Sequence, residues 1–211
     1  MKTKFIINPI AGTGKQIDIE NSILKNIDEN IFDYDIEYTL KPNHATEIST
    51  NAIKAKYELI VSVGGDGTAS ECADGLIGSE TALAVIPCGS GNGFAYHFNV
   101  KRNIEDALKQ LNSNRIKYID SCLANNLKFI NVSGIGFDAH IANLFASTIK
   151  RGFLSYIKLT LKEVFYKAKF YKLKYDDINR KVNAFAIVFA NASQYGNDAR
   201  IAPNAIEDDG L

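Results

Sequence analysis

Tyr57-Glu58-Leu59-Ile60-Val61-Ser62-Val63 leads directly into Gly64-Gly65-Asp66-Gly67-Thr68. A short apolar run that ends at glycines is typical of a buried strand followed by a tight turn. Residues 68–77 then fit a helix. The same order recurs along the first half of the chain, with strands expected at 4–8, 35–39 and 81–87. Helices are expected over about 19–27, over a stretch capped by Asn43 or Thr46 that runs to about Lys56, and over 104–111. This alternation predicts a parallel sheet with helices on both faces.

From about residue 115 the pattern changes to a β-rich one. Strands are expected at 116–123, 127–132, 171–175 and 182–189, with one helical stretch from 138 to about 166. We therefore predict an α/β domain over residues 1–113 and a β-rich second domain over 114–211. The last residues, Glu207-Asp208-Asp209-Gly210-Leu211, form an acidic turn of the kind that leads into another strand. We expect the second domain to be incomplete at its C-terminus.

Composition and cysteine spacing argue against a nucleic-acid-binding protein, a disulfide-rich or zinc-binding protein and a membrane-spanning protein. Apolar residues make up 46% of the 211 residues, and 24 basic side chains balance 24 acidic ones. A formal net charge of zero gives no global attraction to nucleic acid, so no nucleic-acid partner is predicted. Cys72, Cys88 and Cys122 have no C-x-x-C spacing, which argues against a disulfide framework or a zinc site and favours the reducing cytoplasm. No apolar run reaches the length of a membrane span.

Three glycine-containing turns follow three of the expected strands: 8–15, 64–68 and 87–93. In an open parallel sheet, ligands bind beyond the carboxyl ends of the strands. Glycine lets backbone N–H groups approach phosphate oxygens, and the helix that follows adds its positive end. The three turns together predict a phosphate-binding site.

Two familiar phosphate-binding motifs fail on spacing. A Walker A loop ending at Lys15 would need glycine at Pro9 and Ser or Thr at Gln16. A dinucleotide G-x-G-x-x-G motif starting at Gly65 would need glycine at Ser70. Neither a P-loop ATPase nor an NAD-dependent dehydrogenase is favoured.

Asp66 adds a carboxylate to the turn at 64–68. A carboxylate near a γ-phosphate can position Mg²⁺ or take the proton from an acceptor hydroxyl. The alternative is a structural one, in which Asp66 caps the following helix.

Read as a series, these motifs resemble the diacylglycerol kinase catalytic-domain family, which includes soluble bacterial lipid kinases and sphingosine and ceramide kinases. The resemblance covers the whole chain. The matching elements are Asn8-Pro9, Thr39, Gly64–Thr68 with Glu71, Pro87-x-Gly-Ser-Gly-Asn92, Asn131-x-x-Gly-x-Gly-Phe-Asp138, and Pro203-x-Ala205 with Asp209-Gly210-Leu211.

The resemblance implies that ATP is held between the two domains and that Mg²⁺ is a cofactor. Residues expected around the nucleotide are Asn8, Thr39, Gly64, Gly65, Asp66, Gly67, Thr68, Glu71 and Ser90, with Arg151 near the phosphates. A structural Mg²⁺ is expected at the last turn, held by the Asp209 carboxylate and the carbonyls of Ile206 and Leu211. Asp66 and Asp138 are the expected catalytic residues, with Asp138 near the acceptor hydroxyl, and the β-rich domain would house the lipid substrate.

Three departures from the family pattern bear on the mechanism. Many bacterial members carry Asp where this chain has Gly93, and Gly93 instead resembles the sphingosine-kinase branch. Asn197-Asp198 replaces glycines that are common after Gly196. The family also continues for several strands beyond Asp-Gly-Leu, and its usual general-base carboxylate lies there.

Residues 150–174 carry eight Lys or Arg against one Glu, with aromatic side chains interleaved. Such a segment predicts contact with anionic headgroups at the inner membrane face, the alternative being a core-packing helix with a solvated basic face. The scattered residues His44, His97 and His140 fit surface or packing positions better than catalysis.

The preferred hypothesis is an ATP-dependent kinase of a lipid hydroxyl, such as that of diacylglycerol or a sphingoid-like lipid. The alternatives are a kinase of a soluble acceptor such as NAD, or a non-catalytic nucleotide- or lipid-binding module. A homodimer is left open, and apolar residues that line an acyl-chain pocket are too interchangeable to identify the lipid.

Overall fold

The computed structural model describes residues 1–12, 18–113, 115–146, 160–163 and 165–210. Two compact units divide the chain, one made of Met1–Asn131 with Ala190–Leu211 and the other of Val132–Phe189. The predicted domain boundary at 113/114 stays a prediction.

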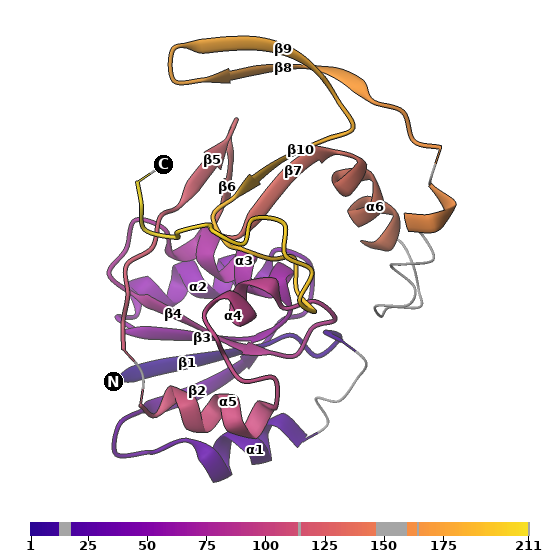
Figure 1. Cartoon of the computed structure of the whole chain (residues 1–211). Coiled ribbons are helices and arrows are strands. Elements are labelled where there is room, and N and C mark those ends of the chain that lie inside the picture. Colours follow the sequence, from indigo (N-terminus) through magenta and orange to yellow (C-terminus); the bar gives the residue numbers. More distant parts are fainter. Residues whose placement is uncertain (13–17, 114, 147–159, 164, 211) are drawn as a thin grey trace. The chain divides into compact units, whose positions relative to one another are not determined.

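The first unit is built on a four-stranded parallel sheet with strand order β2-β1-β3-β4 (Figure 1). The strands are β1 (Lys2–Ile7), β2 (Asp33–Tyr38), β3 (Leu59–Gly64) and β4 (Ala82–Pro87). In the register, Ile7 pairs with Val63 and Gly64 pairs with Pro87. The carboxyl ends of β1, β3 and β4 therefore reach the same edge of the sheet, as the sequence predicted.

Helices cover both faces of this sheet, because alternate residues of each strand point to opposite sides. They are α1 (Ile19–Asn26), α2 (His44–Lys54), α3 (Asp66–Leu76), α4 (Gly93–His97) and α5 (Ile104–Leu111). Phe5 and Val61 pack with α1 and α5 on one face. Ile6 and Ile60 pack with α2 and α3 on the other. Figure 1 shows these two helical layers, and the predicted α/β class is confirmed.

A short hairpin of β5 (Cys122–Ala124) and β6 (Leu127–Phe129) also belongs to the first unit. The predicted strand at 116–123 is largely wrong, since residues 115–121 have no regular secondary structure. Asp120 explains why: its N–H donates to the Glu207 carbonyl over 2.7 Å, and its carbonyl accepts from Asn191 Nδ2 over 3.0 Å. Its polar backbone groups are thus taken by other segments of the chain.

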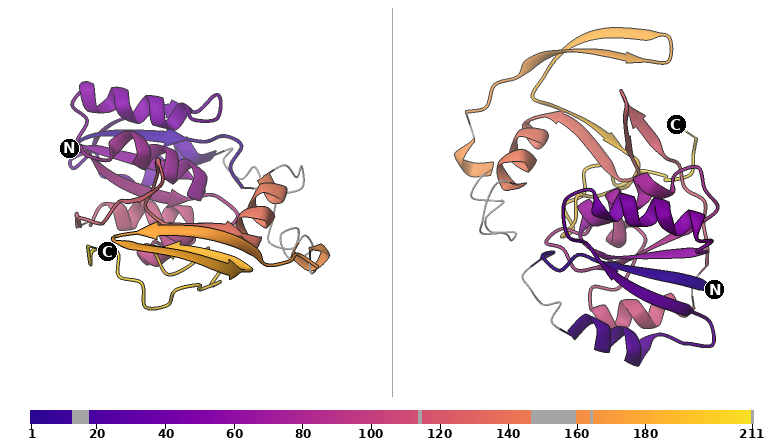
Figure 2. Two further views of the ribbon diagram at one scale, coloured as in Figure 1. Left: turned by 90° about the horizontal axis from the view of Figure 1, so that it is seen from above. Right: turned by 180° about the vertical axis from the view of Figure 1, so that it is seen from behind.

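The second unit contains β7 (Val132–Gly136), α6 (Phe137–Ala146), β8 (Lys169–Tyr175), β9 (Ile178–Ala184) and β10 (Ala186–Ala190). β10 pairs with β7, and β8 pairs with β9 in the long antiparallel hairpin that Figure 2 shows from two further sides. Phe137, Tyr166 and Phe185 form an aromatic cluster with ring centroids 4.4–5.5 Å apart. The predicted strand 182–189 is split at Phe185, whose carbonyl accepts from the Phe137 N–H. Much of the predicted helix at 138–166 falls on 147–159, outside the described residues.

Candidate phosphate-binding site

Asn8 ties the end of β1 to the first turn of α3. Its Nδ2 donates to Thr68 Oγ1 over 3.0 Å, and its Oδ1 accepts from the Ile10 N–H over 3.1 Å. Its own N–H donates to the Val63 carbonyl over 3.0 Å. These bonds fix the turn after β1 beside the end of β3. Two residues that the sequence predicted to bind nucleotide, Asn8 and Thr68, therefore lie in direct contact.

The turns after β3 and β4 touch through their backbones. A Cβ added at Gly89 would lie 2.5 Å from Gly65 Cα, and one added at Gly65 would lie 3.1 Å from Gly89 Cα. A Cβ at Gly64 would lie 2.5 Å from Thr68 Oγ1. Carbon atoms do not pack this closely without strain. Gly64 and Gly89 therefore leave no room for a Cβ, and a Cβ at Gly65 would press on the other turn.

Gly67 differs from these three glycines. A Cβ added there would meet nothing within 4 Å, so protein packing leaves the space beside it open. Gly67 lies in the first turn of α3, an eleven-residue helix whose N-terminal N–H groups favour an anion. Open space at a helix N-terminus, next to turns that admit only glycine, fits a phosphate group.

Asp66 holds the start of α4 rather than capping α3. Its Oδ1 accepts from the Phe94 N–H over 3.0 Å and from Asn131 Nδ2 over 3.4 Å. Burial raises the pKa of this carboxyl group, and the backbone N–H groups of Phe94, Gly93 and Asn92 oppose the rise. A raised pKa makes the carboxylate a better proton acceptor near neutral pH. The sequence identified Asp66 but not these partners.

Asn92 closes the turn after β4. It has the left-handed φ of 61°, its Oδ1 accepts from the Gly89 N–H over 2.8 Å, and its Nδ2 donates to the Gly89 carbonyl over 2.8 Å. The sequence motif included Asn92 but gave it no role. The neighbouring Gly93 has no room for a side chain, because a Cβ there would lie 2.4 Å from the Gln194 carbonyl oxygen. A side chain at position 93, aspartate included, would have to displace the backbone at Gln194 and Tyr195.

Thr39 and Ser90 lie at the same edge of the sheet. The Thr39 N–H donates to the Ile7 carbonyl over 2.9 Å, which places Thr39 beside the last residue of β1. Ser90 follows β4, and its carbonyl accepts from Asn197 Nδ2 over 2.7 Å. Asn197 itself has a left-handed φ of 50°. Asn197, one of the predicted departures from the family pattern, therefore supports one of the predicted phosphate turns.

Glu71 has a structural role in addition to its predicted place near the nucleotide. Its Oε2 accepts from the Ala45 N–H over 3.3 Å, and its carbonyl accepts from Thr46 Oγ1 over 2.9 Å. Asn43, the residue before α2, makes no side-chain capping bond. Glu71 satisfies one of the free N–H groups at the start of α2 in its place.

The predicted metal-binding turn is exposed. Ile206 and Asp209 are both solvent-exposed, and the Gly210 N–H donates to Asp120 Oδ2 over 2.7 Å. Leu211 lies outside the described residues. Across the part of the chain that the structure describes, no three His, Cys, Asp or Glu side chains gather as a metal site. The predicted set contains one carboxylate and two carbonyls, and oxygen ligands of this kind suit Mg²⁺.

Two further predictions fall on undescribed parts of the chain. Asp138 is the second residue of α6, but its side chain is not among those described. Arg151 lies within 147–159, which is outside the described residues.

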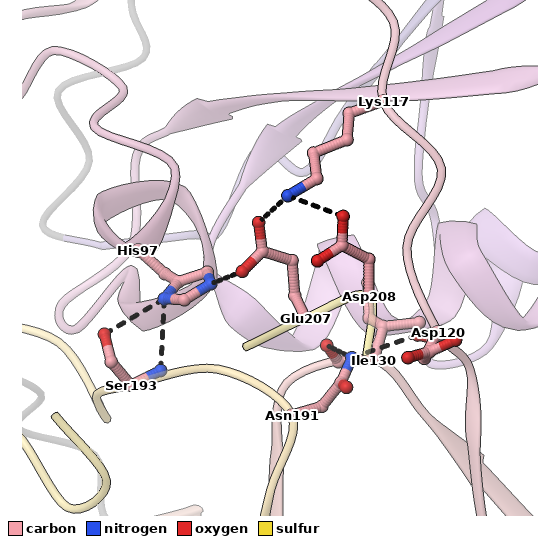
Figure 3. A network of polar contacts seen from close by, with 8 residues as sticks. All are labelled: His97, Lys117, Asp120, Ile130, Asn191, Ser193, Glu207 and Asp208. Carbon is pink, nitrogen blue, oxygen red and sulfur yellow. Dashed lines mark hydrogen bonds and ion pairs between the residues drawn. The ribbon is translucent and has the colours of Figure 1, made fainter. Parts of the chain in front are cut away.

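The segment that carries Asp209 is fastened by a polar network that the sequence did not reveal (Figure 3). Glu207 is at its centre, with Oε2 3.0 Å from His97 Nε2 and Oε1 2.5 Å from Lys117 Nζ. Lys117 Nζ also lies 3.0 Å from Asp208 Oδ2. The bond from Lys117 lowers the pKa of the Glu207 carboxyl group to about 2, assisted by His97. Glu207 is therefore ionised at neutral pH.

The model of the diacylglycerol kinase catalytic domain matches residues 2–124, and that of the YegS C-terminal NAD kinase beta sandwich-like domain matches residues 131–211. The first match covers more than half of the chain. This chain belongs to the diacylglycerol kinase catalytic-domain family.

Individual relatives agree with this membership. A protein of Chromohalobacter salexigens named "Probable lipid kinase YegS-like" is 30% identical over 83% of this chain and 59% of its own length. A diacylglycerol kinase of Staphylococcus epidermidis is 24% identical over 99% of this chain and 68% of its own length. The crystal structure of a diacylglycerol kinase from Bacillus anthracis strain Sterne aligns with a TM-score of 0.72 and 28% identity, covering 99% of this chain and 70% of that one.

The chain spans 48–64% of the length of the first three curated relatives that it matches. Within the described residues, no helix combines the length and the apolar character needed to cross a bilayer.

Proposed function

We propose that this protein transfers the γ-phosphate of ATP to a hydroxyl group of a lipid. One observation carries the proposal: the ends of β1, β3 and β4 bring together turns that touch only because they are glycine, beside the open N-terminus of α3. Turns of this kind favour a polyphosphate. Membership of the diacylglycerol kinase catalytic-domain family favours a lipid acceptor over a soluble one.

In this proposal the backbone at Gly65–Thr68 and Ser90 binds the nucleotide phosphates, with Asn8 and Thr39 beside them. Asp66 positions the metal or takes the proton of the acceptor hydroxyl, for which its raised pKa is suited. A structural Mg²⁺ would be held by Asp209 and the carbonyls of Ile206 and Leu211, and when bound it would tie these oxygen atoms of the last turn together. Asp138 and Arg151 keep their proposed places near the acceptor and the phosphates.

The decisive experiment supplies γ-labelled ATP and Mg²⁺ with separate panels of lipid vesicles and soluble acceptors. The wild-type protein is expected to label a lipid, and Asp66→Asn is expected to label it at least about 10²-fold more slowly. Label appearing only in a soluble product would exclude the lipid hypothesis and favour an NAD kinase-like activity. Tight ATP binding with no product in either panel would favour the non-catalytic module.

The basic segment gives a separate reason to expect a lipid interface. Of residues 150–174, those in the described ranges include exposed lysines at 162, 167, 169, 172 and 174. Phe165 and Phe170 keep 89% and 68% of their surface exposed. We therefore propose peripheral contact with anionic membranes through this segment. Co-sedimentation with vesicles containing phosphatidylglycerol, but not with pure phosphatidylcholine, is expected; equal binding to both would exclude an electrostatic contact.

A further inference from the structure

α4 is short, and each end of it is bonded to a different part of the proposed site. At its start, the Phe94 N–H donates to the Asp66 carboxylate. At its end, His97 contacts Glu207, which is 110 residues further along the chain. One rigid turn of helix therefore connects the proposed catalytic carboxylate to the segment that carries Asp209.

The His97 ring is held at both nitrogens, and its side chain is 9% exposed. Nδ1 accepts from the Ser193 N–H over 3.2 Å, and because a backbone amide can only donate, Nδ1 is unprotonated in this arrangement. The ring proton is then on Nε2, which donates to Glu207 Oε2 over 3.0 Å. The orientation of His97 thus determines where the Glu207 carboxylate lies.

Glu207–Gly210 is fastened on both sides of Asp209. The Glu207 carboxylate binds His97 and Lys117, and the Glu207 carbonyl accepts from the Asp120 N–H over 2.7 Å. On the other side, the Gly210 N–H donates to Asp120 Oδ2. Asp209 lies between these attachment points, so a shift of Glu207 would move it (Figure 3 shows Glu207 and its partners).

We propose that His97 and Glu207 are positioning residues that set the location of the Asp209 turn relative to α4 and Asp66. This inference rests on the proposed function, because it concerns the turn assigned there to Mg²⁺. Neither residue needs to touch the metal or the substrate. Second-layer groups of this kind typically change metal affinity by about 10- to 100-fold when they are replaced.

The test uses Glu207→Gln, which keeps the size of the side chain. A glutamine oxygen can accept from His97 or from Lys117, but its NH₂ group can accept from neither. One of the two contacts is therefore lost. The matched control is Glu47→Gln on the exposed face of α2. It breaks the ion pair in which Glu47 Oε1 lies 2.8 Å from Lys41 Nζ.

Lys117 provides a second pair of variants. Lys117→Met removes the cation that joins Glu207 to Asp208, whereas Lys117→Arg keeps a cation and should restore the wild-type behaviour.

The measurement is Mn²⁺ binding by electron paramagnetic resonance, with Mn²⁺ in place of Mg²⁺ and without a lipid acceptor. Glu207→Gln and Lys117→Met are expected to weaken binding by about tenfold, in line with other second-layer groups. Glu47→Gln and Lys117→Arg are expected to stay within twofold of wild type. ATP affinity should not change in any variant.

Wild-type protein that binds no Mn²⁺, or variants that bind it as wild type does, would overturn the inference. Because no turnover is measured, its failure is distinct from that of the proposed kinase activity. A weakened Mn²⁺ affinity in a protein that phosphorylates no lipid would uphold the positioning role and reject the activity.

Discussion

The glycine turns at the sheet edge and the terminal segment Glu207–Gly210 belong to the same proposed site, yet they are held in different ways. Gly65 and Gly89 meet through backbone atoms, with no charge involved. Glu207 is held by the Lys117 ammonium group and by the ring of His97, both at least 90 residues away in the sequence. The first region depends on the absence of side chains and the second on particular pairs of them. The two should therefore respond differently to substitution and to salt.

The largest expected effect comes from Asp66→Asn. The amide cannot serve as a base, so turnover should fall by about 10²- to 10⁴-fold, the usual contribution of general acid–base catalysis. The amide oxygen can still accept from the Phe94 N–H, so the fold and ATP binding should persist. Steady-state kinetics and ATP titration measure both. Unchanged turnover would remove Asp66 from the mechanism.

Gly89→Ala tests the backbone contact. The added Cβ would press on Gly65 Cα, and overpacking of this kind costs about 1–3 kcal/mol in the free energy of unfolding. Gly67→Ala is the matched control, because its Cβ meets no protein atom and alanine favours a helix by up to about 1 kcal/mol. Urea denaturation should show a loss for Gly89→Ala only, while ATP titration should show weaker binding for both. Tight ATP binding by Gly67→Ala would contradict a phosphate beside Gly67.

The pH dependence of stability should identify the buried charge at Asp66. Burial raises its pKa in the folded protein above the ordinary value of about 4. The unfolded chain therefore releases this proton at a lower pH, and wild type loses stability relative to Asp66→Asn as the pH rises from about 4 through the folded pKa. Denaturant titrations between pH 4 and pH 8 measure this difference. If wild type instead gained stability relative to Asp66→Asn over this range, the pKa of Asp66 in the folded protein would be lowered rather than raised.

Salt should loosen the terminal segment and leave the glycine turns unchanged. At 1 M salt the screening length falls to about 3 Å, and partly exposed ion pairs such as Lys117 with Glu207 and Asp208 contribute about 0–1 kcal/mol. Hydrogen exchange at the Asp120 amide should therefore accelerate by up to about fivefold. The Cys88 amide is bonded to the Gly64 carbonyl over 2.7 Å, and its exchange rate should be the same at low and high salt. Equal acceleration at both amides would remove the proposed contrast.

The smallest expected effect concerns two cysteines. Burial raises the pKa of Cys72 to about 11 and that of Cys88 to about 12, so both thiols are protonated at neutral pH. Neither should react with a disulfide reagent in the native protein, although Cys88 follows β4 directly. Counting titratable thiols before and after denaturation measures this. Rapid native labelling of Cys88 would show that the turn opens.

Much of the sheet edge could be predicted from short stretches of sequence. The strand before Gly64 and the glycines after it are local features, and the parallel alternation places Asn8, Gly65 and Ser90 at one edge. The terminal region was harder to predict. From the sequence, His97 was expected at a surface or packing position, and residues 116–123 were expected to form a strand. No spacing in the sequence links either of them to Glu207. Side chains so far apart in the sequence leave no periodic signal.

The sequence by itself therefore determined the family, the parallel α/β core and the positions of the glycine turns, since glycine, apolar runs and turn residues act over a few neighbours. The tertiary structure alone decided which side chains fasten those turns: Asp66 to the start of α4, Glu71 to the start of α2, and Glu207 to His97 and Lys117. These pairs form only after the sheet has brought distant segments within hydrogen-bonding distance, and each partner was chosen by geometry rather than by its place in the chain.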